Sequence, residues 1–486
     1  MFKANKKFYI TTTLPYVNAD PHIGFALEII QADVMARYYR NAGYKVFFNT
    51  GVDEHGLKIF RKAKENNLDP QKYCNIYAKK FDDLKSALGL SYNNFIRTTD
   101  KHHQEAAQEF WKLCEKNKDI YLKNYKIKYC VGCELEKTES ELVDGKCPVH
   151  PNLELEMIEE ENYFFRYSKY QKKLLNFYKK NPEFVIPEKR YNEIKGFTEK
   201  GLEDFSISRL KEKMPWGVPV PGDDKHVMYV WFDALVNYIS CLGWPDFAKA
   251  SSGKARNLFK EFWPGLQVAG KDNLRQQSSM WQAMLLSAGL PNSKQIFIHG
   301  FITSDGKKMS KSLGNVVNPV DLVNKYGTDA VRYYLLREIP PTEDGDFTYD
   351  KFEQRYNSDL AGGIGNLVAR VLGIALKMEK VKLKPSQKII KEAKKTRKDC
   401  SALTEGFRFN EALSALWDLM SYCDKYINEE KLWETKSPQV ISDLFFAIGE
   451  LGAMLEPFLP ETSVKIEKAI DERKSEALFP RINSDK

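Results

Sequence analysis

The stretch NADPHIGFALEIIQAD, Asn18–Asp33, places a histidine and a glycine at the start of an apolar helix, directly behind a hydrophobic run. A helix that begins just after Pro21 has unpaired backbone N–H groups and its positive dipole end at His22 to Phe25. Gly24 removes the side chain that would keep a ligand away. The stretch predicts an anion site where nucleotides bind in open parallel sheets. Alternatively, Gly24 only eases packing and His22 only caps the helix.

The hydrophobic pattern around this stretch changes twice along the chain. From Lys7 to about Cys114, short β-rich runs alternate with helix-length segments, which is typical of parallel βαβ winding. The same alternation returns in HVMYVWFDAL, LQVAGKD, MWQAMLLSAGL and QIFIHGFI, and after about Thr348 the pattern is helical. The sequence therefore predicts a split α/β domain with an insertion, followed by a helical domain.

Composition indicates a soluble globular protein. Hydrophobic residues make up 43% and charged residues 29% of the 486 residues, and the net charge is +8. This modest charge allows a polyanionic partner without requiring one. We find no apolar run long enough to cross a bilayer and no secretory signal in MFKANKKFYITTT, so we expect a cytoplasmic location.

A basic segment, TSDGKKMSKSLGNVVNP (Thr303–Pro319), starts with a Ser-Asp-Gly turn and spaces its lysines with serines and a glycine. This composition is typical of a mobile loop. A lysine ammonium is a compact charge that can follow a moving phosphate and stabilise a transition state. The segment predicts a phosphate-binding loop with Lys307, Lys308 and Lys311; a solvated basic turn is the alternative.

Three of the eight cysteines lie close together. CVGC, thirteen further residues and CPVH form two short-spaced pairs, Cys130 with Cys133 and Cys147 with His150. This spacing predicts a four-ligand zinc site. Because all four ligands come from the protein, we expect a structural role rather than a catalytic one. Free buried cysteines are the alternative.

Six motifs occur in one order along the chain: TLPYVNADPHIG, NTGVDEHG, ISR, YVWFDAL, GKD and HGFITSDGKKMSKSLGN. HIG after the first strand and KMSKS after the last resemble the paired nucleotide-binding signatures of class I aminoacyl-tRNA synthetases. In order and spacing, all six are similar to those of the methionyl-tRNA synthetase family, in its form with one zinc knuckle. The resemblance covers essentially the whole chain.

The pattern and the resemblance imply an α/β fold. We expect a Rossmann-like doubly wound parallel sheet, split by a zinc-containing connective insertion and followed by an all-α helical bundle. The expected regions are the first half of the catalytic domain (1–114), the connective insertion with the zinc knuckle (115–225), the second half of the catalytic domain (226–300), the KMSKS loop with a stem-contact region (301–350) and the α-helical anticodon-binding domain (351–486).

The resemblance implies an ATP-dependent methionine-tRNA ligase. The methionine carboxylate would attack the α-phosphorus of ATP, and the adenylate would pass its acyl group to the 3′ end of tRNA(Met), initiator tRNA included. This chemistry needs positioning and charge stabilisation more than a nucleophile. Mg²⁺ is expected with ATP. The implied catalytic residues are His22, Lys308, Lys311 and Arg209, and the implied ATP-binding residues are His22, Gly24, Lys308, Met309, Ser310, Lys311 and Ser312.

The implied methionine pocket is apolar with one anionic anchor. Asp53 would accept the α-ammonium through a charge-assisted hydrogen bond, and aromatic rings would surround the polarisable thioether. Trp231 and Tyr238, seven residues apart, also fit ordinary core aromatics on one helical face. The implied substrate-binding residues are Leu14, Tyr16, Asp53, Trp231, Ala234, Tyr238, Gln277 and Asp272.

Two positions depart from the family pattern. Phe25 stands where the nucleotide signature usually ends in a second histidine, so ATP binding would depend more on the lysine loop. Gln277 replaces a histidine that many relatives carry in the pocket. An amide can hydrogen-bond there but cannot take a protonation-dependent role.

The helical third of the chain carries the implied anticodon reader. Asn366 and Arg370 lie four residues apart, on one helical face, and Trp433 lies in a later helical loop. In the family, the matching residues recognise the CAU anticodon, with the tryptophan stacked on an exposed base. Leu432 replaces a common proline before this tryptophan, and a core tryptophan is the alternative.

Two other functions are open. A sister synthetase for isoleucine, valine or leucine would need a large editing domain, for which the insertion is too short. A cysteinyl enzyme would need metal ligands in its substrate pocket. A non-catalytic tRNA-binding paralogue conflicts with the intact His22, Asp53, Lys308 and Lys311. The chain stops soon after the helical domain, so we expect a monomer.

Overall fold

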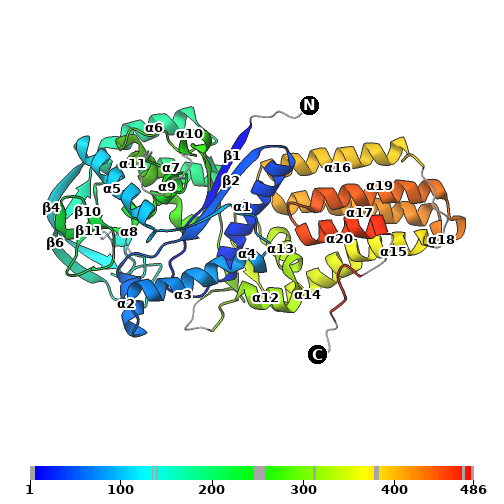
Figure 1. Ribbon diagram of the computed structural model, residues 1–486, viewed down its shortest axis with the longest axis horizontal. Helices are drawn as coiled ribbons and strands as arrows, with labels where there is room; N and C mark the ends of the chain where they lie inside the picture. Colours follow the sequence, from blue (N-terminus) through cyan, green and yellow to red (C-terminus); the bar gives the residue numbers. More distant parts are fainter. Residues whose placement is uncertain are drawn as a thin grey trace. The chain divides into compact units, whose positions relative to one another are not determined.

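The computed structural model describes residues 6–133, 135–137, 141–245, 258–309, 314–376, 383–472 and 477–482 (Figure 1). It divides into two compact units, each made of separate stretches of chain. The first unit comprises Met1–Asp20, Tyr44–Asp83 and Tyr92–Ile298, and the second comprises Pro21–Gly43, Leu84–Ser91 and His299–Lys486. The predicted fold class, an α/β core with an insertion and a C-terminal helical domain, is confirmed.

A six-stranded sheet forms the centre of the α/β core. The strands follow the order β3-β2-β1-β12-β13-β7, and β1 pairs in parallel with both β2 and β12. The last residue of β13 begins the second unit. The sheet strands are β1 (Lys7–Thr12), β2 (Lys45–Val52), β3 (Asn94–Arg97), β12 (Leu266–Gly270), β13 (Gln295–His299) and β7 (Val185–Ile186).

The apolar runs become strands because the sheet buries them. In β12, all five residues are buried, as expected for a central parallel strand covered on both faces. The edge strand β7 pairs in parallel with β13 but comes from the region expected to form the insertion. That region therefore contributes a strand to the main sheet as well as its own ribbon.

The rest of the first unit surrounds this sheet. Its helices are α2 (Leu57–Glu65), α3 (Pro70–Asp82), α5 (Lys101–Lys116), α6 (Gln171–Lys180), α7 (Glu188–Glu199), α8 (Val230–Ala234), α9 (Asn237–Ser240), α10 (Phe259–Phe262) and α11 (Trp281–Ser287). Two antiparallel sheets, of order β5-β4-β6-β8 and β10-β11-β9, contain β4 (Ile120–Cys130), β5 (Leu135–Lys137), β6 (Glu156–Phe165), β8 (Phe205–Ser206), β9 (Ser208–Leu210), β10 (Pro219–Val220) and β11 (Asp223–Met228).

The segment HVMYVWFDAL does not continue the parallel winding, so that prediction was wrong. Its first part belongs to β11, which pairs antiparallel with β9, and the chain then enters the short helix α8. A single apolar run of this length fits a strand or a buried helix equally well. Here the first part of the run forms a strand and the second part forms a helix.

The second unit contains the helical bundle. Its helices are α1 (Ile23–Asn41), α4 (Leu84–Ala87), α12 (Pro319–Tyr326), α13 (Thr328–Arg337), α14 (Tyr349–Arg355), α15 (Asn366–Ala375), α16 (Gln387–Glu405), α17 (Phe409–Glu429), α18 (Leu432–Thr435), α19 (Pro438–Leu455) and α20 (Pro460–Glu472). A small sheet of order β15-β14-β16 contains β14 (Ile302–Ser304), β15 (Lys307–Lys308) and β16 (Gly345–Phe347).

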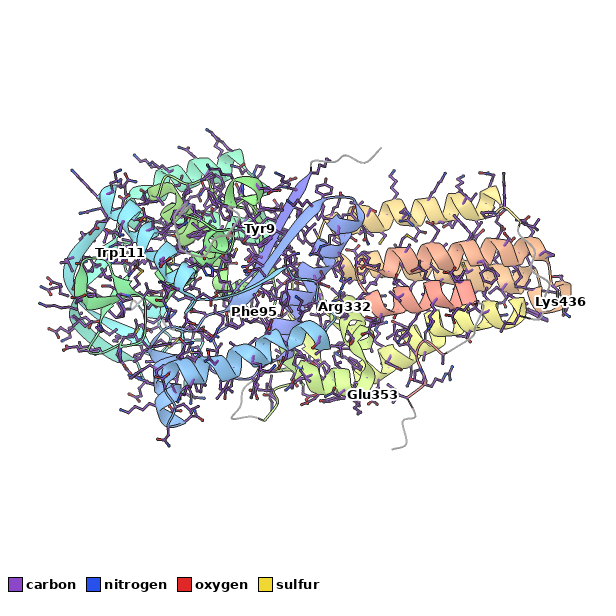
Figure 2. All side chains as sticks on the ribbon, viewed as in Figure 1. Tyr9, Phe95, Trp111, Arg332, Glu353 and Lys436 are labelled. Carbon is purple, nitrogen blue, oxygen red and sulfur yellow. The ribbon has the colours of Figure 1, made fainter. Side chains whose placement is uncertain are left out.

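Helix α1, which the sequence predicted after Pro21, carries a buried carboxylate. Asp33 forms ion pairs with Arg332 of α13, which Figure 2 labels, and with Arg37, both at 2.9 Å, and it accepts hydrogen bonds from Ser91. Burial raises the pKa of Asp33, but the two arginines and Ser91 outweigh burial and lower it. The charged network therefore connects α1 to α13 and to the segment Leu84–Ser91.

One helix in the described part of the chain, α19, is long and apolar enough to cross a membrane by length and composition. The sequence analysis found no such run. The buried share of its window is 56%, and Leu444, Ile448 and Leu451 are fully or almost fully buried. Packing against α17 and α20 explains this apolar character as that of a bundle core.

Candidate functional site

Asp53 lies directly behind β2, at the carboxyl end of a central strand. It is 3% exposed, and its backbone pairs with the segment around Tyr16. Its Oδ1 is 3.4 Å from the Thr98 hydroxyl and 3.5 Å from the backbone nitrogen of His55, both donors. These contacts therefore fix the position of the predicted ammonium-binding carboxylate at the carboxyl end of β2.

The structure brings some of the predicted methionine-pocket residues together. Tyr16 and Trp231 pack against the same small cluster of Tyr129, Tyr229 and Val230. Leu14, which precedes this segment, is half-buried.

Two further predicted pocket residues are directly bonded: the Gln277 Nε2 donates to the Tyr238 hydroxyl at 2.7 Å. Ala234 and Tyr238 are buried. Trp231 and Tyr238 do not share one helical face, because α8 ends at Ala234 and α9 begins at Asn237. Asp272, in a short 3₁₀ turn after β12, is exposed.

The sequence analysis missed a buried hydrogen-bond network. This network connects α8, which carries Trp231, with α9, which carries Tyr238. Asp233, between Trp231 and Ala234, bonds through one carboxylate oxygen to His55 at 2.7 Å and through the other to His103 at 2.9 Å. The second nitrogen of His103 is 2.9 Å from the Ser240 hydroxyl.

Burial raises the pKa of Asp233, but the two histidines outweigh burial and hold it below its usual value. The network therefore fixes the position of α8 relative to the segment that carries Asp53.

Arg209 of the ISR motif is buried in the first unit. Its Nη1 donates to the Ser206 hydroxyl and to the Ser208 carbonyl, both at 2.7 Å. Its guanidinium carbon lies 4.4 Å from the Tyr229 ring centroid and 5.3 Å from that of Tyr129. Such an arrangement holds a permanent cation in a defined orientation, as electrostatic stabilisation of phosphate chemistry requires.

The HIG segment and the beginning of the lysine loop meet within the second unit. His22 caps α1: its Nδ1 accepts from the Gly24 N–H at 3.0 Å. A Cβ at Gly24 would lie 2.8 Å from the His22 ring and 3.9 Å from Met309. Glycine is therefore required for the ring to lie over the helix start. The capping role is confirmed, and the anion-binding role stays a prediction.

The described residues include the first part of the lysine loop. Lys307 and Lys308 form β15, which pairs with β14. Ser310, Lys311 and Ser312 lie outside the described residues, so their predicted contacts are untested. Phe25 follows His22 in the first turn of α1 and is half-buried.

The four predicted metal ligands form one cluster. The ligand atoms of Cys130, Cys133, Cys147 and His150 all lie within 4.8 Å of one another. The Cys133 sulfur is 3.1 Å from the His150 Nδ1 and 3.5 Å from the Cys147 sulfur. A Cβ at Gly132 would lie 2.6 Å from the His150 ring. The donor set and its spacing fit a metal ion with four protein ligands.

The predicted anticodon residues gather at one end of the helical bundle. Asn366 and Arg370 lie on α15, where Asn366 is exposed. The Arg370 guanidinium carbon is 5.6 Å from the ring centroid of Trp433 on α18. Trp433 is 48% exposed, whereas Leu432 before it is buried. The alternative of a core tryptophan is therefore wrong.

Models of two known protein families match almost the whole chain. The family model "tRNA synthetases class I (M)" matches residues 8–153 and 140–372, and the model "Anticodon-binding domain of tRNA ligase" matches residues 386–484. The sheet, the insertion and the helical domain thus define a class I aminoacyl-tRNA synthetase.

The curated relatives specify the amino acid. A methionine–tRNA ligase of Thermosynechococcus vestitus is 42% identical over 94% of this chain and 89% of its own length, and one of Thermotoga maritima is 41% identical over 95% and 74%. The structure of Mycobacterium tuberculosis methionyl-tRNA synthetase in complex with methionyl-adenylate aligns with a TM-score of 0.88, at 37% identity over 95% and 93% of the two chains. The chain belongs to the methionyl-tRNA synthetases.

Proposed function

We propose that the chain activates L-methionine with ATP to methionyl-adenylate and transfers the methionyl group to the 3′ end of tRNA(Met). The supporting observation is the buried contact of Asp233 with His55, which positions the anionic anchor Asp53 beside the segment of Trp231 and Ala234. A carboxylate for the α-ammonium next to an aromatic wall for the thioether suits methionine.

In the proposed reaction, the methionine carboxylate oxygen bonds to the α-phosphorus of ATP and pyrophosphate leaves. The chain contributes donors and cations rather than a nucleophile. We assign phosphate contacts to His22, Lys308, Lys311 and Arg209, and the remaining nucleotide contacts to Gly24, Met309, Ser310 and Ser312. We assign the amino acid to Leu14, Tyr16, Asp53, Trp231, Ala234, Tyr238 and Gln277, with Asp272 in support from the neighbouring strand end.

The proposal includes two metal ions with different roles. Zn²⁺ would be held by Cys130, Cys133, Cys147 and His150, and it would stabilise the insertion, because four protein ligands complete a tetrahedral site. Mg²⁺ would accompany ATP, held mostly by phosphate oxygens and water.

We further propose that Asn366, Arg370 and Trp433 read the CAU anticodon, so that both elongator and initiator tRNA(Met) are substrates. The exposed Trp433 ring beside the Arg370 cation supports this assignment. A monomeric state in solution, a cytoplasmic location and the region boundaries expected from the sequence belong to the same proposal. Light scattering on the purified chain tests the monomer.

ATP–pyrophosphate exchange, measured with each of the twenty amino acids in turn, tests the proposed activity. We expect exchange with methionine well above that with every other amino acid. Exchange with another amino acid would indicate a sister synthetase, and exchange with none would indicate a non-catalytic paralogue.

A further inference from the structure

Gln277, which we assign to the methionine pocket, lies in the π-helical segment Gln276–Met280. The backbone N–H of Trp281 donates to the Gln276 carbonyl, five residues back, whereas an α-helical N–H bonds four residues back. The π-helical turn therefore contains one residue more than an α-helical turn. Single turns of this kind are frequent at functional sites.

The side chain of Gln277 is held by one hydrogen bond. Its Nε2 donates to the Tyr238 hydroxyl at 2.7 Å, and its buried Oε1 has no hydrogen-bond partner among the described residues. A glutamine side chain rotates about several bonds. One hydrogen bond therefore leaves the direction of this amide dependent on the backbone of the π-helical segment.

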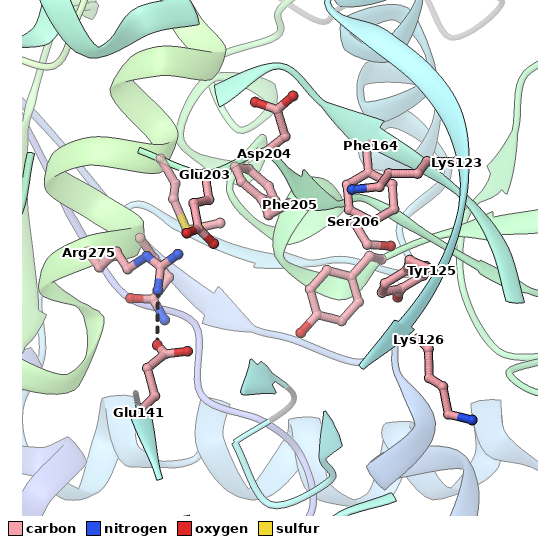
Figure 3. Close-up of a pocket in the computed structure, with 13 residues that line it drawn as sticks. Lys123, Tyr125, Lys126, Glu141, Phe164, Glu203, Asp204, Phe205, Ser206 and Arg275 are labelled. Atoms are coloured by element: carbon pink, nitrogen blue, oxygen red, sulfur yellow. Dashed lines mark hydrogen bonds and ion pairs between the residues drawn. The ribbon is translucent and has the colours of Figure 1, made fainter. Parts of the chain in front are cut away.

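Another side of the π-helical segment lines a cavity of about 240 Å³ (Figure 3). Gln276 and Met280 border this cavity, together with residues of β4 and β6. Arg275, directly before the segment, also lines it and pairs with Glu141 at 3.3 Å. A cavity leaves the atoms that line it without packing partners on that side. The segment therefore depends on contacts from its other sides.

Gln282 of α11 provides such a contact. It is fully buried, and its Nε2 donates to the Gln277 carbonyl at 2.8 Å and to the Ser293 hydroxyl at 3.0 Å. Its Oε1 accepts from the Ser293 N–H at 3.0 Å and from the Asn292 amide at 3.1 Å. All four hydrogen-bonding positions of the amide are thus used, which fixes its orientation.

The same hydrogen bonds connect the π-helical segment to the central sheet. The Ser293 hydroxyl donates to the Oε1 of Gln267 on β12 at 2.8 Å. The bonded series therefore runs from β12 through Ser293 and Gln282 to the backbone of Gln277. A buried series of this kind stabilises one arrangement of the groups that it joins.

We propose that Gln282 is a positioning residue for methionine recognition, because its amide fixes the π-helical turn that directs Gln277 to Tyr238. Without this amide, the Gln277 carbonyl loses its side-chain donor, and the turn can relax to an α-helical turn with one residue fewer. This relaxation rotates Gln277 away from Tyr238 by about 100°, the angle between successive residues of an α-helix. The inference rests on the proposed function, in which Gln277 contacts methionine.

The test is a double-mutant cycle that compares the natural protein with Gln282→Met, Gln277→Met and the variant with both changes. Methionine keeps the length of the glutamine side chain but lacks the amide. Methionine-dependent ATP–pyrophosphate exchange gives the KM for methionine and the KM for ATP, and neither value depends on the folded fraction of a preparation. Gln295→Met is a matched control, because the Gln295 amide donates to the Glu183 carbonyl at 2.9 Å, outside the π-helical segment.

We expect Gln282→Met to raise the KM for methionine about tenfold, the effect of one lost buried hydrogen bond, and to leave the KM for ATP unchanged. Gln277→Met should raise the KM for methionine by a similar factor. The variant with both changes should show no further rise, since Gln282 acts through Gln277. Gln295→Met should match the natural protein.

An unchanged KM for methionine in Gln282→Met or in Gln277→Met would overturn the inference. An equal rise in the KM for ATP would also overturn it, because the effect would then not be specific to methionine. The same holds if the two increases multiply in the variant with both changes, since Gln282 would then act independently of Gln277. Absence of methionine-dependent exchange in the natural protein would contradict the proposed function and, with it, this inference.

Discussion

Two of the arginines that lie beside aromatic rings differ in how far the contact is buried. Arg209 is 4% exposed and lies 4.4 Å from the Tyr229 ring. Arg370 lies 5.6 Å from Trp433, whose ring is 48% exposed. A cation–π contact contributes about 0.5–1 kcal/mol at an exposed site and about 2 kcal/mol when it is desolvated. In the proposed function, the buried pair would fix a charge for chemistry, and the more exposed pair would present a ring to tRNA.

The largest expected effect comes from the buried pair. Arg209→Met should lower methionine-dependent ATP–pyrophosphate exchange by about 10²–10³-fold, the usual cost of removing a preorganised charge from a transition state. Arg209→Lys should recover part of this loss, because it restores the charge but not the planar fork. Arg166, which is exposed, lies in the same unit and is 4.2 Å from the Tyr121 ring, provides the control Arg166→Met. Equal exchange in Arg209→Met and Arg166→Met, with matching thermal unfolding, would contradict the assignment.

Substitution of Trp433 should affect tRNA charging rather than methionine activation. Trp433→Ala should lower kcat/KM for tRNA charging by about 10–100-fold, because stacking on one base contributes about 1–3 kcal/mol, and it should leave exchange unchanged. Val464→Ala is the control, because Val464 on α20 is 61% exposed, lies in the same unit and is outside the expected stem-contact region. A parallel loss of charging and exchange would indicate misfolding rather than recognition.

Metal removal should affect the surroundings of Arg209 but not those of Trp433, and its effect should be smaller than that of the two substitutions. Cys130 directly follows Tyr129, whose ring centroid is 5.3 Å from Arg209. Chelation should therefore lower the Tm by several degrees and weaken exchange, since structural zinc contributes folding free energy. Binding of an isolated CAU anticodon hairpin should not change. Metal analysis that finds no zinc in a fully active preparation would refute the zinc assignment.

The smallest expected effect concerns the nucleotide signature. Phe25→His should lower the KM for ATP by about 2–10-fold, because one added hydrogen bond contributes about 0.5–1.5 kcal/mol. The KM for methionine should stay the same. Steady-state exchange with varied ATP measures this effect. A large loss of activity would show that Phe25 is needed for packing instead.

The sequence predicted features that depend on short spacing. The four metal ligands all lie within residues 130–150, and the strands β1, β2 and β12 form from apolar runs of sequence. HVMYVWFDAL was misassigned because an apolar run does not reveal whether its partners are strands or a helix packed on a core. The two-residue strand β7 carries too little pattern to be recognised before its neighbour β13 is known.

Site residues that act through distant partners could not be predicted. His55 and His103 bond Asp233 across 178 and 130 residues, so no local spacing connects these three residues. Arg370 and Trp433 were predicted only through the resemblance, and the structure brings them together. The signal that could have pointed to Asp233 is a carboxylate within an otherwise apolar run, which requires buried partners.

The most direct test of this division of labour transplants the CAU anticodon into a tRNA for another amino acid. Methionylation of this tRNA and methionine-dependent exchange are measured with the natural protein and with Trp433→Ala. The account predicts that the natural protein charges the transplanted tRNA, whereas Trp433→Ala charges it at least tenfold less efficiently with full exchange. Equal charging by both proteins would contradict it.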